Sequence, residues 1–532
     1  MDLTALIVLI VIVFVIVIIV MVLSQIQQPK SLKSKILASF GNVPNGEDVN
    51  IESVAKYAKS IFHHDLRIDR ITWNDLDMDS VYKRINACSS SVGEEYLYNT
   101  LHEIKFGKAE LLERESLVEF FEQNPQACFD AQFALANLGK SDYNGIASLL
   151  FGADIKLLSW PYVYKILAVV PLVFLVTTPF NMTIGIMGIA LSFITNMIFH
   201  YSAMRYAETE MPAIKYFSAM LNCCGKLYKI DSVSKLPIIE NLRQHFNVFK
   251  SIMAKAPTSV GIYLNIIFLI DVRYYNDFAR LITAHSQAFH QVYKTIGEID
   301  SALSILSFRK SLSAFCTPQF SDKNELEFEE IYHPMIQEPI TNTHKFCNDI
   351  LITGSNASGK STFIKTLAIN GILAQTIHTC TAKKFVTRIS MTVTSMAVRD
   401  DLFGGESYFI VEIKSLKRIV DLTAKYPCIC YVDEILRGTN TMERIAASTA
   451  ILTYLNKQDC LCVVASHDIE LTRLLKHDNY HFCEQVTDNN IVFDYKLKQG
   501  ATTTRNAIKL LDFMGFENEI VSHAKELVAS RD

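Results

Sequence analysis

The chain lacks an excess of charge of either sign. Its 532 residues include 51 Lys and Arg and 55 Asp and Glu, for a formal net charge of −4. A protein that binds nucleic acid over its whole surface carries a basic excess, and this composition excludes that class. Internal repeats and low-complexity tracts are also absent from the sequence. The length predicts about two to four folding units.

Paired C-x-x-C motifs are missing as well. The 12 cysteines are scattered, and several lie within apolar stretches: Cys428, Cys430, Cys460 and Cys462. Zinc sites of the finger and ribbon types need paired motifs at a set spacing. We therefore expect no zinc site, and instead expect buried thiols in a reducing compartment.

Charge is absent from a long run near the start of the chain. Leu3 to Leu23 holds no charged residue and is long enough to cross a hydrocarbon core of about 30 Å. A secretory signal would need a basic start and a shorter apolar core. Here Asp2 precedes the run and three lysines follow it within residues 30–35. This favours a transmembrane anchor over residues 1–24 with the following chain in the cytoplasm, and then a polar linker over residues 25–65.

A second apolar block lies between Trp160 and Tyr201. Its two uncharged runs, Ile166 to Phe180 and Ile184 to Phe199, are joined by a short link without charge, and basic residues flank the pair. This pattern favours a transmembrane hairpin over residues 160–201. A buried pair of helices in a soluble domain is the alternative, because both runs are short. We expect a multi-pass protein of the cell membrane in which the chain after the hairpin lies in the cytoplasm.

The periodicity of the chain changes near residue 318. Residues 66–317 are predominantly helical in pattern, and Ile262 to Ile270 within them is expected to be a core helix. Residues 318–532 alternate short apolar strands with helices, which is typical of an α/β sheet. The sequence predicts an all-α domain, including the transmembrane helices, followed by an α/β domain.

A phosphate-binding pattern opens the α/β domain. Gly354 to Ser361 has the spacing G-x-x-x-x-G-K-[ST], with an apolar strand before it and a helical run after it. In that context the glycines let backbone N–H groups turn toward phosphates at a helix N-terminus. Lys360 is expected to reach the β- and γ-phosphates, and the Ser361 hydroxyl to bind Mg²⁺. The α/β domain is therefore predicted to be a P-loop NTPase domain.

Two further apolar strands end in chemically useful side chains. Cys428 to Val432 leads into Asp433-Glu434, and Cys460 to Ala465 leads into Ser466 and His467. The carboxyl ends of such strands meet at the ligand crevice of an open α/β sheet. Asp433 is predicted to bind Mg²⁺, and Glu434 to polarise the attacking water.

These motifs resemble the MutS mismatch-repair ATPases. The phosphate loop Gly354–Thr362 is similar to theirs, and residues 433–441 resemble their D-E-I-G-R-G-T-S-T box except at Leu436 and Asn440. Residues 407–413 are similar to the S-T-F-M-V-E-M signature, and residues 465–471 resemble the A-T-H-x-x-E-L switch. The resemblance covers about residues 325 to 529. A weaker resemblance upstream, around Ser91 to Leu97 and Glu298 to Leu306, is to the helical core or lever domain.

The resemblance implies a set of site residues. Glu434, His467 and Lys360 are expected to be catalytic, with His467 sensing the γ-phosphate. Ser407 is expected to reach the γ-phosphate held by the opposite subunit, and Tyr495 to lie on the adenine; a core Tyr is the alternative. The expected ATP-binding residues are Gly354, Ser355, Asn356, Ala357, Ser358, Gly359, Lys360, Ser361, Thr362, Ser407, Arg437 and Tyr495. Ser361 and Asp433 are expected to bind Mg²⁺.

The resemblance leaves the partner open. It implies a homodimer formed through the ATPase domains, and DNA is one expected partner. However, no Phe-x-Glu wedge motif lies near the start, and the predicted hairpin interrupts the helical domain. A membrane-anchored MutS-like ATPase acting on DNA is therefore one hypothesis. The other is a MutS-like ATPase without DNA binding that couples ATP hydrolysis to a membrane or protein partner. Three predicted crossings are few for a transporter.

Overall fold

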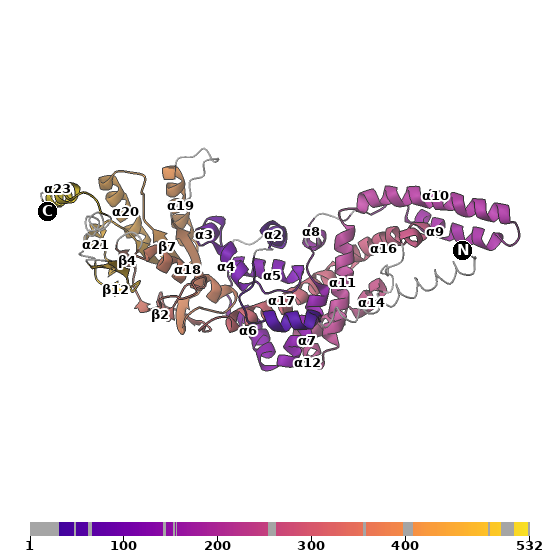
Figure 1. The fold of residues 1–532 in the computed structure, drawn as a ribbon, viewed down its shortest axis with the longest axis horizontal. Coiled ribbons are helices and arrows are strands. Elements are labelled where there is room, and N and C mark those ends of the chain that lie inside the picture. Colours follow the sequence, from indigo (N-terminus) through magenta and orange to yellow (C-terminus); the bar gives the residue numbers. More distant parts are fainter. Residues whose placement is uncertain are drawn as a thin grey trace, which may run out of the picture. The chain divides into compact units, whose positions relative to one another are not determined.

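The protein is described by a computed structural model, shown in Figure 1. It describes residues 31–46, 49–61, 66–141, 145–152, 155, 157–253, 262–354, 358–396, 408–487, 490–501 and 515–529. Two compact units result. The first comprises Met1–His63, Asn86–Asn99 and Leu117–Phe308, and the second comprises His64–Ile85, Thr100–Ser116 and Arg309–Asp532. The predicted helical domain 66–317 is therefore not one unit, because three of its segments, residues 66–85, 100–116 and 309–317, belong with the α/β region. The predicted transmembrane anchor 1–24 lies outside the described residues.

Helices make up the first unit. Those lying wholly within it are α2 (Ile51–Ser60), α7 (Pro125–Leu138), α8 (Ile146–Phe151), α9 (Pro161–Thr177), α10 (Met182–Ala207), α11 (Met211–Tyr228), α12 (Asp231–Ser234), α13 (Pro237–Arg243), α14 (Phe246–Met253), α15 (Ile262–Phe268) and α16 (Ile270–Ala284). The boundary between the units falls inside α5 (Ser91–His102), α6 (Lys108–Gln123) and α17 (Ser286–Lys310). The predicted run 262–270 is divided between α15 and α16.

Helix α2 corrects the predicted linker 25–65. The side chain of Asn50 caps its N-terminus by accepting a 3.2 Å hydrogen bond from the Ser53 N–H. Val54 and Tyr57 are buried, and the Tyr57 ring packs against Phe151 and Tyr293 with centroids 5.1 and 4.7 Å away. The segment appears polar in sequence because only one face of this helix is apolar. It is part of the core of the first unit.

Asp300 of α17 fixes the start of α5. It is 2% exposed and accepts hydrogen bonds from the Ser89 N–H at 3.0 Å and from the Ser90 N–H and hydroxyl at 2.8 and 2.5 Å. A Cβ on Gly93 would fall 2.2 Å from an Asp300 oxygen, so this close approach needs glycine. Burial raises the pKa of Asp300 to about 6 despite the hydrogen bonds from Ser90 and Ser89. The two segments that resemble the MutS helical core therefore meet in the structure.

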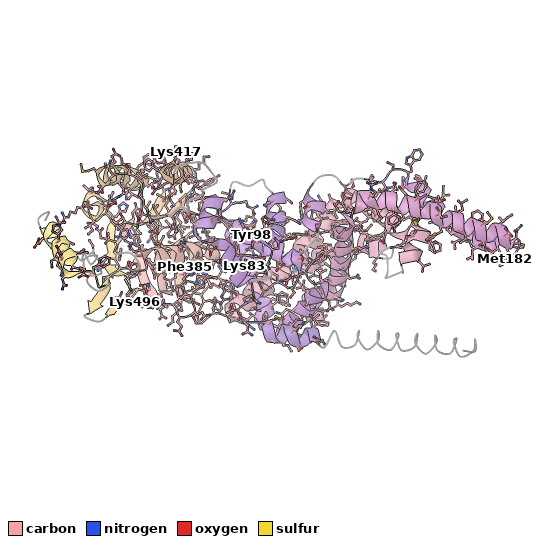
Figure 2. The ribbon with its side chains drawn as sticks, turned by 45° about the horizontal axis from the view of Figure 1, so that its top comes forward. Lys83, Tyr98, Met182, Phe385, Lys417 and Lys496 are labelled. Atoms are coloured by element: carbon pink, nitrogen blue, oxygen red, sulfur yellow. The ribbon has the colours of Figure 1, made fainter. Side chains whose placement is uncertain are left out.

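Helices α9 and α10 form an apolar hairpin. They run side by side with Met182 at their tip (Figure 2), and Gly188 gives room for the Phe174 ring. The Asn196 amide donates to the Leu167 carbonyl across the pair at 3.1 Å. Many large apolar side chains stay exposed, among them Ile166, Val176, Phe180, Met182, Met187, Leu191 and Ile198. Within the described residues, only Met182–Arg205 is long and apolar enough to cross a membrane, and α9 is shorter.

Three sheets organise the second unit. The central sheet has the order β12-β9-β4-β8-β7-β6, and a four-stranded sheet has the order β1-β5-β2-β3. The strands are β1 (Gln319–Ser321), β2 (Leu326–Ile331), β3 (Asn342–Phe346), β4 (Ile350–Thr353), β5 (Lys384–Arg388), β6 (Met391–Ser395), β7 (Cys428–Asp433), β8 (Cys460–Ala465), β9 (Asp478–His481), β10 (Glu484–Thr487), β11 (Asn490–Phe493) and β12 (Lys498–Gln499). Strands β10 and β11 pair separately. The helices are α3 (Arg70–Asp75), α4 (Met78–Ile85), α18 (Lys360–Thr376), α19 (Tyr408–Thr423), α20 (Thr441–Leu455), α21 (Leu471–Leu474) and α23 (Asn518–Ala529).

The centre of the six-stranded sheet is parallel and fully buried. Strand β8 pairs in parallel with β4 on one side and with β7 on the other, and every residue of these three strands is buried. Such strands are mostly apolar because helices cover both faces of the sheet. Tyr431 faces α18, where Gly371 lies opposite its hydroxyl. The α/β prediction for this region is confirmed.

A buried ion pair stabilises the second unit near the end of α18. Arg309, 3% exposed, donates two hydrogen bonds of 2.7 and 2.6 Å to the Glu115 carboxylate. It also donates to the Thr379 hydroxyl at 2.9 Å and the His378 carbonyl at 3.0 Å. His378 Nδ1 lies 3.0 Å from the same carboxylate. This network holds the chain just after the helix that begins at Lys360.

We expect this pair to make the second unit sensitive to acid. Burial raises the pKa of Glu115, but hydrogen bonds from Arg309 and His378 outweigh it and lower the pKa to about 2. The unfolded value is near 4.5, so the stabilisation is complete above pH 4.5 and is lost as the pH falls toward 2. The free energy at stake is on the order of 3 kcal/mol. Urea unfolding between pH 6 and 3 should show this loss in the wild type.

The matched control for the acid titration is Glu115→Gln. This variant cannot gain a proton at the site as the pH falls, so its stability should be lower at pH 6 and fall less steeply toward pH 3. Equal slopes in the two proteins would contradict the role given to Glu115.

Candidate nucleotide site

The phosphate loop joins β4 to α18. Gly354 has φ +145° and Gly359 has φ +101°, both in the left-handed range that favours glycine. A Cβ on Gly354 would lie 2.6 Å from the Phe482 carbonyl oxygen. The residues between, Ser355–Ala357, lie outside the described residues, whereas Ser358 is buried. The predicted strand before the loop and helix after it are present as β4 and α18, and the helix begins at Lys360.

Lys360 is held inside the loop that it follows. It is 4% exposed, and its ammonium donates a 2.7 Å hydrogen bond to the Gly354 carbonyl. Ser361 and Thr362, on the first turn of α18, are exposed. A buried ammonium next to exposed hydroxyls at a helix N-terminus is suited to binding an anion.

The acidic pair lies at the end of β7. Asp433, the last residue of the strand, is 5% exposed and pairs in register with Ala465 of β8. Glu434 follows with φ +59°, and its N–H donates to the Ala465 carbonyl at 2.9 Å. The Ser466 N–H in turn donates to the Ile352 carbonyl at 3.0 Å. The ends of β4, β7 and β8 are therefore joined, as predicted from the three motifs.

Glu434 and His467 form a direct pair. His467 Nε2 lies 2.8 Å from Glu434 Oε1, and Arg437 Nε contacts the other carboxylate oxygen. Burial raises the pKa of Glu434, but the His467 hydrogen bond and the charges of Arg437 and Lys360 outweigh it and lower the pKa below its ordinary value. Glu434 is therefore ionised at neutral pH, as an acceptor for a water proton must be.

Two carboxylates that sequence reasoning left out fix the chain segments next to Glu434 and His467. Asp468 accepts hydrogen bonds of 2.8 and 2.6 Å from Arg444 of α20, which fixes the loop next to His467. Glu412 of α19 is 5% exposed and accepts a 3.2 Å hydrogen bond from the Arg437 N–H. Glu412 is part of the 407–413 signature, so that motif could have indicated it.

Comparison with known proteins agrees with this geometry. Residues 350–531 match the family model MutS domain V. This region is a MutS-type ATPase domain. DNA mismatch repair protein MutS of Thermotoga maritima is 29% identical over 259 residues, which cover 46% of this chain and 32% of that protein. MutS of Clostridium perfringens is 27% identical over 270 residues, covering 47% of this chain and 30% of that protein. The chain thus matches about a third of the length of these curated relatives.

The MutS-type domain departs from the family's box at two positions, and the structure explains both. Leu436 has φ +57° where the family pattern has glycine, a conformation that costs a residue with a Cβ about 1–2 kcal/mol. Its side chain is 5% exposed, so apolar burial offsets that cost. Asn440 replaces a serine and caps α20 by accepting a 3.0 Å hydrogen bond from the Glu443 N–H. Asn and Ser are comparable N-caps.

Tyr495 lies beside the phosphate loop of the MutS-type domain. A Cβ on Gly359 would lie 2.9 Å from its ring, and the ring stacks on Phe493 with centroids 5.8 Å apart. Tyr495 is 42% exposed, so it is not a core residue. An exposed aromatic face next to the loop is compatible with the predicted contact to adenine. Ser407 lies outside the described residues, and its predicted role stays a prediction.

The residues present fit ATP and Mg²⁺. The two glycines remove the Cβ atoms that would narrow the phosphate loop, and Lys360 supplies a buried positive charge. The Ser361 hydroxyl and the Asp433 carboxylate are hard oxygen donors of the kind that Mg²⁺ prefers. The domain is an ATPase domain of the MutS family, and these residues would hold its nucleotide and metal.

Proposed function

We propose that this protein is a membrane-held MutS-like ATPase in which MgATP closes a homodimer through the ATPase domains. The observation that carries the proposal is the Glu434–His467 pair, formed where β7 and β8 end beside Lys360. Bound Mg²⁺ would supply the positive charge that offsets the phosphoryl group during transfer. Lys360 and the loop N–H groups bind the phosphates, and Ser361 and Asp433 bind the metal. Glu434 accepts the proton of the attacking water while His467 and Arg437 hold its carboxylate.

The membrane part of the proposal is supported by the α9–α10 hairpin. Phe180 at its turn is 89% exposed and Leu191 on α10 is 66% exposed. A row of such side chains on a soluble protein would be a large exposed apolar surface, which monomers rarely present to water. Residues 160–201 and the predicted anchor 1–24 together give a multi-pass protein of the cell membrane with a cytoplasmic ATPase domain.

Carbonate extraction tests this insertion. The full chain should stay with the membrane pellet, and so should a chain lacking residues 1–24, because the hairpin remains. Adding Leu191→Lys and Ile198→Lys to the truncated chain should release most of it, since a lysine at the bilayer centre costs roughly 2.5–3.5 kcal/mol. The matched control places the same two charges at the exposed Asn241 and Gln244 of the first unit. Release of the truncated chain without further substitution would contradict insertion of the hairpin.

The hairpin also favours one of the two hypotheses about DNA. Binding to the phosphate backbone needs clustered Lys and Arg, whereas α9 and α10 expose apolar side chains. We therefore favour an ATPase that couples hydrolysis to a membrane or protein partner, with mismatch-repair-like DNA binding as the second candidate. Binding of the full chain in lipid discs to homoduplex and mismatched DNA should be weak at 150 mM salt. Tight, mismatch-dependent binding there would favour the second candidate.

A further inference from the structure

Four cysteines line one face of the central sheet, away from the nucleotide. Strands β7 and β8 pair in parallel with Cys428 opposite Cys460 and Cys430 opposite Cys462. Side chains alternate along a strand with a period of two, so all four thiols point to the same face. Tyr431 points to the other face, toward α18. The face with the thiols is the one next to α20, because the Cys460 thiol donates to the Leu455 carbonyl at 3.2 Å.

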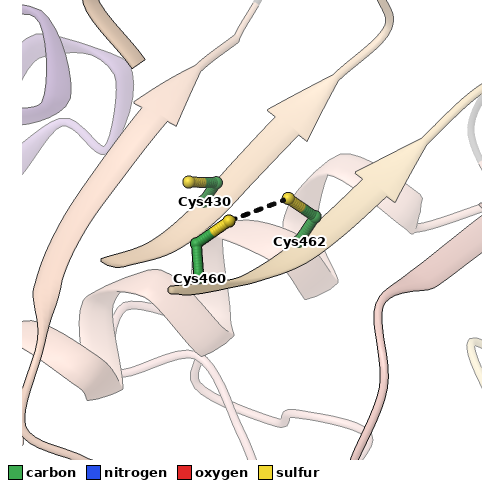
Figure 3. Close-up of side chains that lie close together, drawn as sticks. All are labelled: Cys430, Cys460 and Cys462. Atoms are coloured by element: carbon green, nitrogen blue, oxygen red, sulfur yellow. Dashed lines mark hydrogen bonds between the residues drawn. The ribbon is translucent and has the colours of Figure 1, made fainter. Parts of the chain in front are cut away.

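Three of these thiols converge. The sulfurs of Cys430, Cys460 and Cys462 all lie within 4.8 Å of one another, and those of Cys460 and Cys462 are 3.8 Å apart (Figure 3). A metal–thiolate bond is about 2.3 Å long, so sulfurs sharing one ion lie about 3.8–4.0 Å apart in tetrahedral or trigonal arrangements. The cluster therefore needs only small side-chain adjustments to hold an ion.

The surroundings of the cluster restrict the kind of ion. Cys430 and Cys462 are 0% exposed and Cys460 is 5% exposed, so water is a poor candidate for a fourth ligand. Cys428 lies on the same face of β7 and is the other thiol to consider as a ligand, but it donates a hydrogen bond to the Tyr426 carbonyl at 3.2 Å. Within the described residues, no His, Asp or Glu belongs to the cluster. Three sulfur donors without a hard ligand suit a soft ion that accepts low coordination, such as Cu⁺, better than Zn²⁺.

We propose that Cys430, Cys460 and Cys462 form a three-sulfur site for a soft monovalent metal ion of the Cu⁺ type. On binding, S–H bonds break and sulfur–metal bonds form, the protons pass to the solvent, and no electron is transferred. The ion would join β7 and β8 three residues before Asp433. The site is independent of the proposed ATPase reaction.

Copper retention tests the site. The full chain in detergent is given Cu⁺ from its bicinchoninate complex under argon, desalted, and analysed for metal. The wild type should retain about one Cu⁺ per chain and unfold at a higher temperature than the metal-free protein, because a ligand that binds only the folded state stabilises it. Cys430→Ala and Cys462→Ala should each retain less than about a fifth as much. Equal retention in these variants, or retention of Zn²⁺ in preference to Cu⁺, would overturn the proposal.

Controls separate this site from the other thiols. Cys223→Ala with Cys224→Ala removes two buried cysteines of α11 and should leave retention unchanged. The exposed Cys347 and the partly exposed Cys316 and Cys483 are replaced by serine in all variants and in the reference protein, which is called the wild type in this experiment. X-ray absorption of the wild type gives a measurement that needs no variant at the cluster. It should show sulfur neighbours alone at about 2.2–2.3 Å, and nitrogen or oxygen neighbours would contradict the site.

Discussion

Glu434→Gln should bind ATP as the wild type does and hydrolyse it at least about a hundredfold more slowly, the scale expected for losing a positioned general base. The amide has the size of the carboxylate but cannot accept a proton from water. ATP affinity should persist because Lys360 and the glycine loop are unchanged. The change also removes the charge that pairs with His467 and Arg437. Because the residues that bind the phosphates are unchanged, the defect should appear in kcat rather than in KM.

A nearby glutamate provides the control. Glu443 lies in the first turn of α20 and accepts a hydrogen bond from the Thr439 hydroxyl at 2.8 Å, away from His467. Glu443→Gln should leave turnover within about twofold of the wild type, as expected for a surface substitution. Single-turnover hydrolysis and nucleotide binding are measured on both variants. A wild-type rate in Glu434→Gln would remove that carboxylate from the mechanism.

The arrangement of the candidate nucleotide site was largely predictable because its motifs are local in sequence. The glycines of the phosphate loop, Lys360, and the acids after an apolar strand are each set by a few adjacent residues. The meeting of Glu434 with His467 followed from a general property of parallel strands, whose carboxyl ends lie at one edge. What could not be predicted is how the site is supported. Glu412 and Arg444 reach it from helices whose packing no local pattern specifies.

Unit boundaries were harder to predict for a similar reason. Residues 64–85 and 100–116 are helical in pattern, like the rest of the first half, yet they cluster with the α/β region. One cause is visible in α3, where Asp75 accepts hydrogen bonds from the Thr394 hydroxyl at 2.7 Å and the Met396 N–H at 3.0 Å. Periodicity indicates the type of an element, but such long-range hydrogen bonds decide which unit it joins.

The thiol cluster shows a further limit of sequence analysis. Motifs for metal sites are searched along the chain, and no C-x-x-C pair predicted this one. Cys430 and Cys462 are brought together by the register of two parallel strands. The sequence pattern that pointed to the cluster was the C-x-C alternation in both strands. It indicates that the cysteines share one face of the sheet, but not how far apart their sulfurs lie.

The second large expected effect follows from the proposed dimer. Ser407 directly precedes α19, whose Phe409 packs against Gly438 and whose Glu412 holds the Arg437 N–H. If Ser407 completes the nucleotide site of the opposite chain, the site is incomplete in a monomer. Ser407→Ala should then bind ATP but hydrolyse it at least about tenfold more slowly, as expected when one transition-state contact is lost. Binding γ-phosphate between subunits would supply the differential affinity that a shift toward the closed dimer requires.

Mixing two inactive full-length chains in lipid discs tests this account most directly. One chain carries Ser407→Ala and the other Lys360→Ala. Each mixed dimer then has one site with both substitutions and one site with neither. The account predicts that mixed dimers recover up to about half of the wild-type activity per dimer, although each chain alone is nearly inactive. Absence of recovery while mixed dimers demonstrably form, or a wild-type rate per chain that persists at monomeric concentrations, would contradict it.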